Sequence, residues 1–194
     1  MLSRMSEKIT DVFVESKIIL FEEKDIYKFG VKQGIMIVLN LFTLFVIGAI
    51  YKMIFDVLIY ILAYIPLRSY AGGFHAKTHA RCYLLSIIIL NTVLLIIKKS
   101  LISVIACCFL TFFNGLLILF LAPVEDENKL LDDVETVTYR KKTLVILLLE
   151  LLCLIVALCV KWFFIVYPVV LAITTLGFLL LIGKLKSKIY SCFS

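Results

Sequence analysis

Three long runs without a charged residue constrain this chain more than any other feature of its sequence. They are Gln33–Tyr51, Ser100–Val124 and Trp162–Gly183, with 19, 25 and 22 residues. Each run is long enough to cross a hydrocarbon layer of roughly 30 Å as one helix. A helix satisfies its own backbone hydrogen bonds, which a lipid environment cannot do for it. These three runs therefore predict membrane-spanning helices.

Three weaker apolar runs lie between the strong ones. Met53–Leu67 carries Asp56, Thr143–Val160 carries Glu150, and Cys82–Ile97 is short. The whole chain is 63% hydrophobic and only 18% charged, which is far from the average of soluble domains. A soluble domain of 194 residues could not bury so much apolar surface. We therefore expect an all-α, polytopic membrane protein with about six transmembrane helices, and treat the two acidic residues inside them as structural.

The first thirty residues are mixed in character and lack the basic start and apolar core of a cleavable signal peptide. Apolar residues recur there at a spacing of three to four, which predicts an amphipathic helix lying on the membrane surface. A soluble helix packed on a neighbour is the alternative. The recurring apolar residues are Leu2, Met5, Ile9, Val12, Phe13, Ile19 and Leu20.

The distribution of basic residues predicts the orientation. If six spans alternate in direction, sixteen of the twenty lysines and arginines fall on the side of the N-terminus. The positive-inside rule then places both termini on the cytoplasmic side of the membrane. The four basic residues on the other side are Lys52, Lys98, Lys99 and Lys161.

These features predict one membrane domain over residues 1–194, with three parts. An amphipathic segment covers 1–30, and a membrane-spanning region covers 31–183 with cytoplasmic loops at 68–81 and 125–142. A cytoplasmic tail covers 184–194. The net charge of +6 favours anionic lipid headgroups or an acidic peptide as partner, not nucleic acid, because no basic-aromatic nucleic-acid module is present. A small helical bundle of this kind could also pair as a homodimer.

One polar window interrupts the apolar pattern: RSYAGGFHAKTHARCYLLS, from Arg68 to Ser86. It contains both histidines of the chain, His75 and His79, and a cysteine, Cys82, directly after a cation. Neighbouring cations favour a thiolate, and imidazole exchanges protons near neutral pH. A thiol with a base in reach is the arrangement of cysteine acyl-transfer enzymes. The adjacent Gly72 and Gly73 would let the backbone turn sharply or approach a substrate.

Helix geometry bears on which histidine could serve as the base. On an unbroken helix, His75 and Cys82 would lie two turns apart, about 10 Å along the axis, which is too far for a hydrogen bond. His79 and Cys82, three residues apart, would be neighbours. His75 can therefore be the base only if the chain bends or unwinds between Gly72 and Arg81, whereas a straight helix favours His79.

Two other interpretations of the window remain open. Histidines and cations at a membrane edge can do no more than contact lipid headgroups. Alternatively, His75, His79 and Cys82, at spacings of four and three, could present three metal ligands on one helix face. The chain has no HExxH motif, no CxxC pair and no obvious fourth ligand, so we predict neither a metal nor a cofactor.

The stretch RSYAGGFHAKTHARCYLL resembles the signature of the AgrB family, the accessory gene regulator B membrane endopeptidases of quorum sensing. LAPVEDENK at Leu121–Lys129, followed by YRKK at Tyr139–Lys142, resembles that family's second conserved region. The length and the multi-span layout are similar too, so the resemblance covers essentially the whole chain. One departure is Leu130, where family members often have proline, which bears on the shape of the loop.

The resemblance implies cleavage of an AgrD-like precursor peptide and closure of its thiolactone or lactone ring. The family's catalytic cysteine then falls on Cys82 and its catalytic histidine on His75, while His79 has no counterpart. Arg68 and Gly73 match further motif positions, and Gly72 is a candidate for the same supporting role. The precursors of the family have acidic tails, which basic residues of the second conserved region could bind. A peptide exporter or small transporter without catalysis is the alternative function. The cationic candidates are Lys129, Arg140, Lys141 and Lys142.

Overall fold

The structure is a computed structural model that describes residues 2–74, 78–124 and 132–193. Within these ranges the side chains of residues 2, 3, 79 and 187–193 are not described. The described residues form helices and no strand beyond one isolated backbone pairing. In chain order the elements are α1 (Leu2–Glu15), η1 (Phe21–Glu23), α2 (Lys24–Tyr51), α3 (Ile54–Ala71), α4 (His79–Lys98), α5 (Val104–Leu121), α6 (Asp133–Val160) and α7 (Phe163–Phe193).

The predicted all-α membrane fold is confirmed. Six helices of the described chain are long and apolar enough to cross a membrane, namely α2 to α7. The three charge-free runs lie within α2, around α5 and, apart from Trp162, within α7, and the three weaker runs correspond to α3, α4 and part of α6. The chain divides into two compact units, Met1–Val46 and Ile47–Ser194.

The first unit joins α1 to the beginning of α2 through polar contacts. Lys24 Nζ lies 2.6 Å from a carboxylate oxygen of Asp11, and Lys28 Nζ lies 3.0 Å from one of Glu7. Apolar side chains of α1 that the sequence pattern singled out, Met5 and Val12 among them, are instead exposed. An exposed apolar face on a short helix is what a helix lying on a membrane surface presents.

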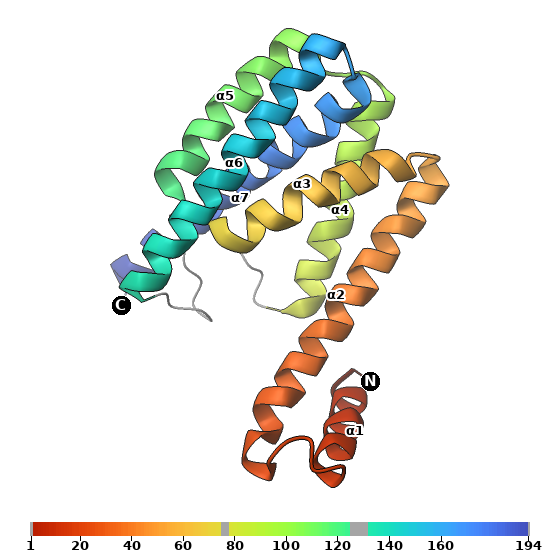
Figure 1. The fold of residues 1–194 in the computed structure, drawn as a ribbon, viewed down its shortest axis with the longest axis vertical. Helices are drawn as coiled ribbons and strands as arrows, with labels where there is room; N and C mark the ends of the chain where they lie inside the picture. The colour runs from red at the N-terminus through yellow and green to blue at the C-terminus, as the bar shows by residue number, and fades with distance from the viewer. Residues whose placement is uncertain (1, 75–77, 125–131, 194) are drawn as a thin grey trace. The chain divides into compact units, whose positions relative to one another are not determined.

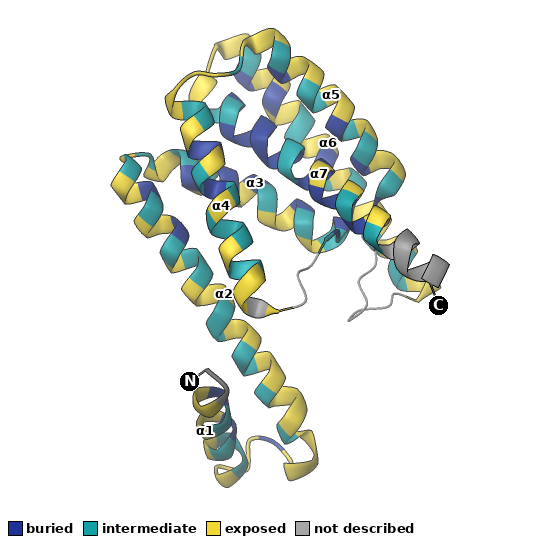
Figure 2. Cartoon of the chain, turned by 180° about the vertical axis from the view of Figure 1, so that it is seen from behind, coloured by how far each residue is buried: buried dark blue, intermediate teal, exposed yellow. Residues whose placement is uncertain are grey.

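The second unit is built around α7. Of the part of α7 that could span a membrane, 61% is buried, compared with at most 33% in each of the other five spans. Helices α3, α4, α5 and α6 all pack on α7, and α5 to α7 lie side by side (Figure 1). Figure 2 shows the result: α7 is buried along most of its length, while the outer faces of the helices around it are exposed. In a membrane those outer faces meet lipid.

Parts of the two expected cytoplasmic loops, 68–81 and 125–142, are helical. Residues 133–142 already belong to α6, and 68–71 and 79–81 belong to α3 and α4. The early start of α6 has a local cause, because Asp132 Oδ1 accepts a hydrogen bond of 2.6 Å from the backbone N–H of Glu135. Acidic residues in the first turn further complement the positive end of the helix. The sequence DDVE at Asp132–Glu135 contains this capping signal, but the basic residues that follow it were interpreted as part of a loop.

Candidate active site

The polar window begins at the end of α3, where two glycines turn the chain. Gly72 has φ 71° and ψ −142°, and Gly73 has φ 114°. These are left-handed backbone conformations that residues with a Cβ atom adopt only with strain. Helix α3 therefore stops at Ala71, and α4 starts only at His79. The window is therefore not one straight helix, which is the condition for His75 as base, but His79 and Cys82 lie three residues apart on α4, as the alternative base requires.

Backbone hydrogen bonds hold this turn against two distant segments. The Val124 N–H donates to Ala71 O at 2.9 Å, and the Gly73 N–H donates to Val124 O at 3.3 Å. The next residue, Phe74, donates its N–H to Leu179 O of α7 at 3.0 Å. The turn is thus tied both to the end of the α5 region and to the central helix of the unit.

Arg68 completes the turn from the last part of α3. One guanidinium nitrogen, Nη1, donates to Gly72 O, and the other, Nη2, donates to Phe74 O at 2.5 Å. A planar guanidinium can donate hydrogen bonds to two carbonyl oxygens at once, and its fixed geometry suits this better than a lysine ammonium does. The predicted supporting residues Arg68, Gly72 and Gly73 are therefore brought together, and the role that the structure gives Arg68 is to fix the backbone on either side of Gly73.

Gly183 of α7 belongs to this site although the sequence did not single it out. A Cβ atom built on Gly183 would lie 2.7 Å from Phe74 N and 3.0 Å from the carbonyl carbon of Gly73. Such distances are too short for any side chain. The turn can approach α7 only because this position has no side chain. Nothing in the sequence near Gly183 resembles a motif, so only the tertiary contact could reveal it.

Cys82 lies in the first turn of α4 as a half-buried free thiol. Thr78 caps that turn, because its Oγ1 accepts from the Arg81 N–H at 3.4 Å and its carbonyl accepts from the Cys82 N–H at 3.1 Å. The start of a helix is its electropositive end and favours an anion.

Both histidines are at the limits of what is described. His75 lies outside the described residues, and for His79 only the backbone, the first residue of α4, is described. His75 follows directly on Phe74, whose N–H and carbonyl are both hydrogen-bonded. Among the described side chains no three potential ligands gather as a metal site would require.

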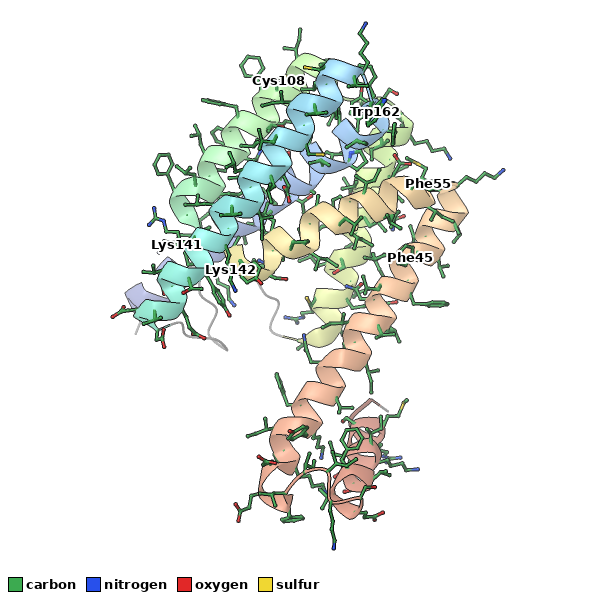
Figure 3. The ribbon with its side chains drawn as sticks, in the orientation of Figure 1. Phe45, Phe55, Cys108, Lys141, Lys142 and Trp162 are labelled. Atoms are coloured by element: carbon green, nitrogen blue, oxygen red, sulfur yellow. The ribbon has the colours of Figure 1, made fainter. Side chains whose placement is uncertain are left out.

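The basic residues of the second AgrB-like stretch, Leu121–Lys129 and Tyr139–Lys142, differ in their contacts. Lys142 Nζ lies 4.8 Å from the centre of the Tyr70 ring, which also meets Tyr139 edge to face at 5.7 Å. All three basic residues, Arg140, Lys141 and Lys142, are exposed on α6, and Lys142 differs from the others in its contact with Tyr70 near the end of α3. Lys141 and Lys142 lie at the opposite end of the second unit from Cys108 and Trp162 (Figure 3). Lys129 lies outside the described residues.

Fold and site together define a class: multi-pass helical membrane proteins with a thiol at the start of one helix and a hydrogen-bonded glycine turn at the end of the helix before it. The chain belongs to the AgrB family, since residues 6–185 match accessory gene regulator B. This family processes peptides in bacterial quorum sensing.

Two curated relatives agree with that assignment. An AgrB-like protein of Clostridium perfringens strain SM101 is 32% identical over 68 residues, and AgrB-like protein 2 of C. perfringens strain 13 is 29% identical over 68 residues. Each match covers 35% of this chain and 32% of the relative, so the chain spans about a third of the length of either relative. No solved structure is similar to the chain.

Proposed function

We propose that this protein is a membrane cysteine endopeptidase that cleaves an AgrD-like precursor peptide and promotes closure of a thiolactone or lactone ring. The observation that carries the proposal is the position of Cys82. It is a half-buried free thiol in the first turn of α4, and the segment that leads into that turn from the fixed Gly72–Phe74 backbone contains His75.

In the proposed first step, the imidazole of His75 takes the proton of the Cys82 thiol, and the thiolate attacks the carbonyl carbon of the scissile peptide bond. The carbon–nitrogen bond breaks, and the imidazolium gives its proton to the departing amine. The N-terminal part of the precursor remains attached to Cys82 as a thioester.

In the second step, a thiol or hydroxyl within the bound peptide attacks the thioester carbonyl and loses its proton. The carbon–sulfur bond to Cys82 breaks, the enzyme thiolate recovers a proton, and the ring is released. Exchange of one thioester for another changes little in free energy, so exclusion of water decides whether the ring forms or the acyl group is hydrolysed. A cytoplasmic site at the membrane boundary would limit access of water.

Precursor binding would use the membrane and the basic residues. An amphipathic precursor can lie on the bilayer surface next to the site, held by apolar area and by the charge of the headgroups. The exposed residues Arg140, Lys141 and Lys142, the last in contact with the Tyr70 ring near the end of α3, would pair with an acidic tail.

The test is cleavage of a co-expressed AgrD-like precursor with a central cysteine and an acidic tail. Cys82→Ser and His75→Ala should each lower cleavage by roughly 10³-fold or more, because the two groups act as one unit. His79→Ala is the matched control and should cleave as the unaltered protein does. Cleavage that survives in both Cys82→Ser and His75→Ala would remove the enzyme function and favour a peptide exporter or transporter.

A further inference from the structure

A groove runs beside the candidate active site, between α4 and α7. It begins at Phe74 and follows α4 from Leu85 to Ile96, against the part of α7 between Leu171 and Ile182. Its volume is about 400 Å³, within the range of pockets that hold small ligands. With a helical rise of 1.5 Å per residue, the stretch on α4 is about 16 Å long.

The groove is lined by apolar side-chain groups along its length. Three of its lining residues are threonines, and each donates its hydroxyl proton to a carbonyl one turn earlier on its own helix. Thr92 bonds to Ile88 O at 2.9 Å, and Thr174 and Thr175 bond to α7 carbonyls at 2.8 and 2.7 Å. Their hydroxyl protons are therefore used internally. The other lining residues are aliphatic or phenylalanine, so a complementary ligand must itself be apolar.

One end of the groove lies one helical turn from the candidate catalytic thiol, which does not itself line the groove. Leu85 follows Cys82 by three residues on α4, so the two side chains are neighbours on one face of the helix. Phe74, at the same end, is the residue that the turn fixes to Leu179 and Arg68. The ammonium of Lys186 lies 5.7 Å from the centre of the Phe74 ring and adds a positive charge there.

We propose that this groove is a subsite for large apolar side chains of the peptide, those that directly precede the carbonyl attacked by Cys82. The inference rests on the proposed function and names the part of the substrate that the site selects. An apolar chain in the groove ends one helical turn from the thiol, and the cation at that end suits the electronegative carbonyl oxygens of a peptide backbone.

The test uses the full chain in lipid vesicles and two synthetic peptide thioesters. The peptides are identical except that the two residues before the thioester carbonyl are Leu-Leu in one and Ser-Ser in the other. The rate of transfer of the acyl group to Cys82 is followed by the mass of the intact protein. Since each apolar contact in a pocket contributes about 1–3 kcal/mol of discrimination, the Leu-Leu peptide should react at least about tenfold faster.

Variants on α4 separate the groove from general partitioning of the apolar peptide into the bilayer. Thr92→Trp at an exposed position of the groove should fill it and abolish the preference for Leu-Leu. Leu84→Trp is the matched control, because Leu84 is 56% exposed and does not line the groove, and it should keep the preference. Ile89→Ala widens the groove by a smaller change and should reduce the preference severalfold.

The outcomes distinguish a failure of the subsite from a failure of the proposed function. Equal rates for the two peptides, or an equal preference in Thr92→Trp and Leu84→Trp, would overturn the subsite and leave the groove as a contact for lipid chains. Failure of both peptides to acylate Cys82 would overturn the proposed function, and the subsite with it. Retention of the preference in Thr92→Val, which removes only the internally bonded hydroxyl, is the expected result for an apolar subsite.

Discussion

Replacement of Gly183 by alanine tests whether the position of the Gly72–Phe74 turn controls activity. The new Cβ atom would lie 2.7 Å from Phe74 N, whereas ordinary contacts begin near 3.4 Å, so the turn must move by about 0.7 Å. That shift stretches the bond of 3.0 Å between the Phe74 N–H and Leu179 O. Misplacement of a catalytic group by about 1 Å can cost about 10²-fold in rate, so cleavage should fall by roughly 10- to 100-fold.

The same substitution should lower the stability of the bundle by at most about 2 kcal/mol. The clash of the new Cβ atom with backbone atoms of the turn costs about 1–3 kcal/mol, and the gain of about 1 kcal/mol in helix propensity offsets part of that cost. Gly115→Ala on α5 is the matched control, because nothing lies within 4 Å of its Cβ position, and it should cleave normally. Precursor cleavage in vesicles and thermal unfolding in detergent are the two measurements. Cleavage by Gly183→Ala at the unaltered rate would refute the reasoning.

Three further substitutions have defined outcomes. Arg68→Lys loses one of the two charge-assisted hydrogen bonds to the turn, which is worth about 1.5–3 kcal/mol. Precursor cleavage should therefore fall about 10- to 100-fold, while the circular dichroism spectrum stays unchanged. Normal cleavage would contradict the role of Arg68 in fixing the turn. Asp132→Ala removes the N-cap of α6 at a cost of about 1 kcal/mol, so amide exchange in the first turn of α6 should accelerate about fivefold, while Asp132→Asn should exchange normally. Gly177→Ala brings its Cβ to 2.9 Å from that of Asn114 and should lower resistance to unfolding by sodium dodecyl sulfate by about 1–3 kcal/mol. Adding Asn114→Gly, which removes that Cβ atom together with the amide, should recover part of the loss, and a lack of any rescue would locate the strain elsewhere.

The number and type of the spans could be predicted from the sequence because lipid imposes a simple requirement. A charge-free run such as Trp162–Gly183 has few alternatives to a spanning helix, and α7 contains all of it except Trp162. Helix boundaries depend on weaker, local effects. The start of α6 at Asp133 follows from the cap that Asp132 provides, and its helical turns beyond the lipid-length run have no hydropathy signal.

The motif residues of the site could be found from their types and spacing, but not their partners. Arg68, Gly72 and Gly73 lie close together in the sequence, and the structure brings them together around one turn. The contacts with Leu179 and Gly183 join segments far apart in the chain, through backbone atoms that every residue carries. No side-chain pattern encodes such contacts, so only the packing of α7 reveals them.

The ties from the glycine turn to Val124 and Leu179 have a consequence for exchanging parts between relatives. Because both ties use main-chain atoms, they do not depend on the side chains of residues 124 and 179, except that proline at 124 would remove the N–H that donates to Ala71. A larger residue at position 73 or 183 would instead force the turn to shift. A chimera that receives the Arg68–Ser86 segment from another family member is therefore best made in a host with glycine at position 183 and any residue but proline at position 124.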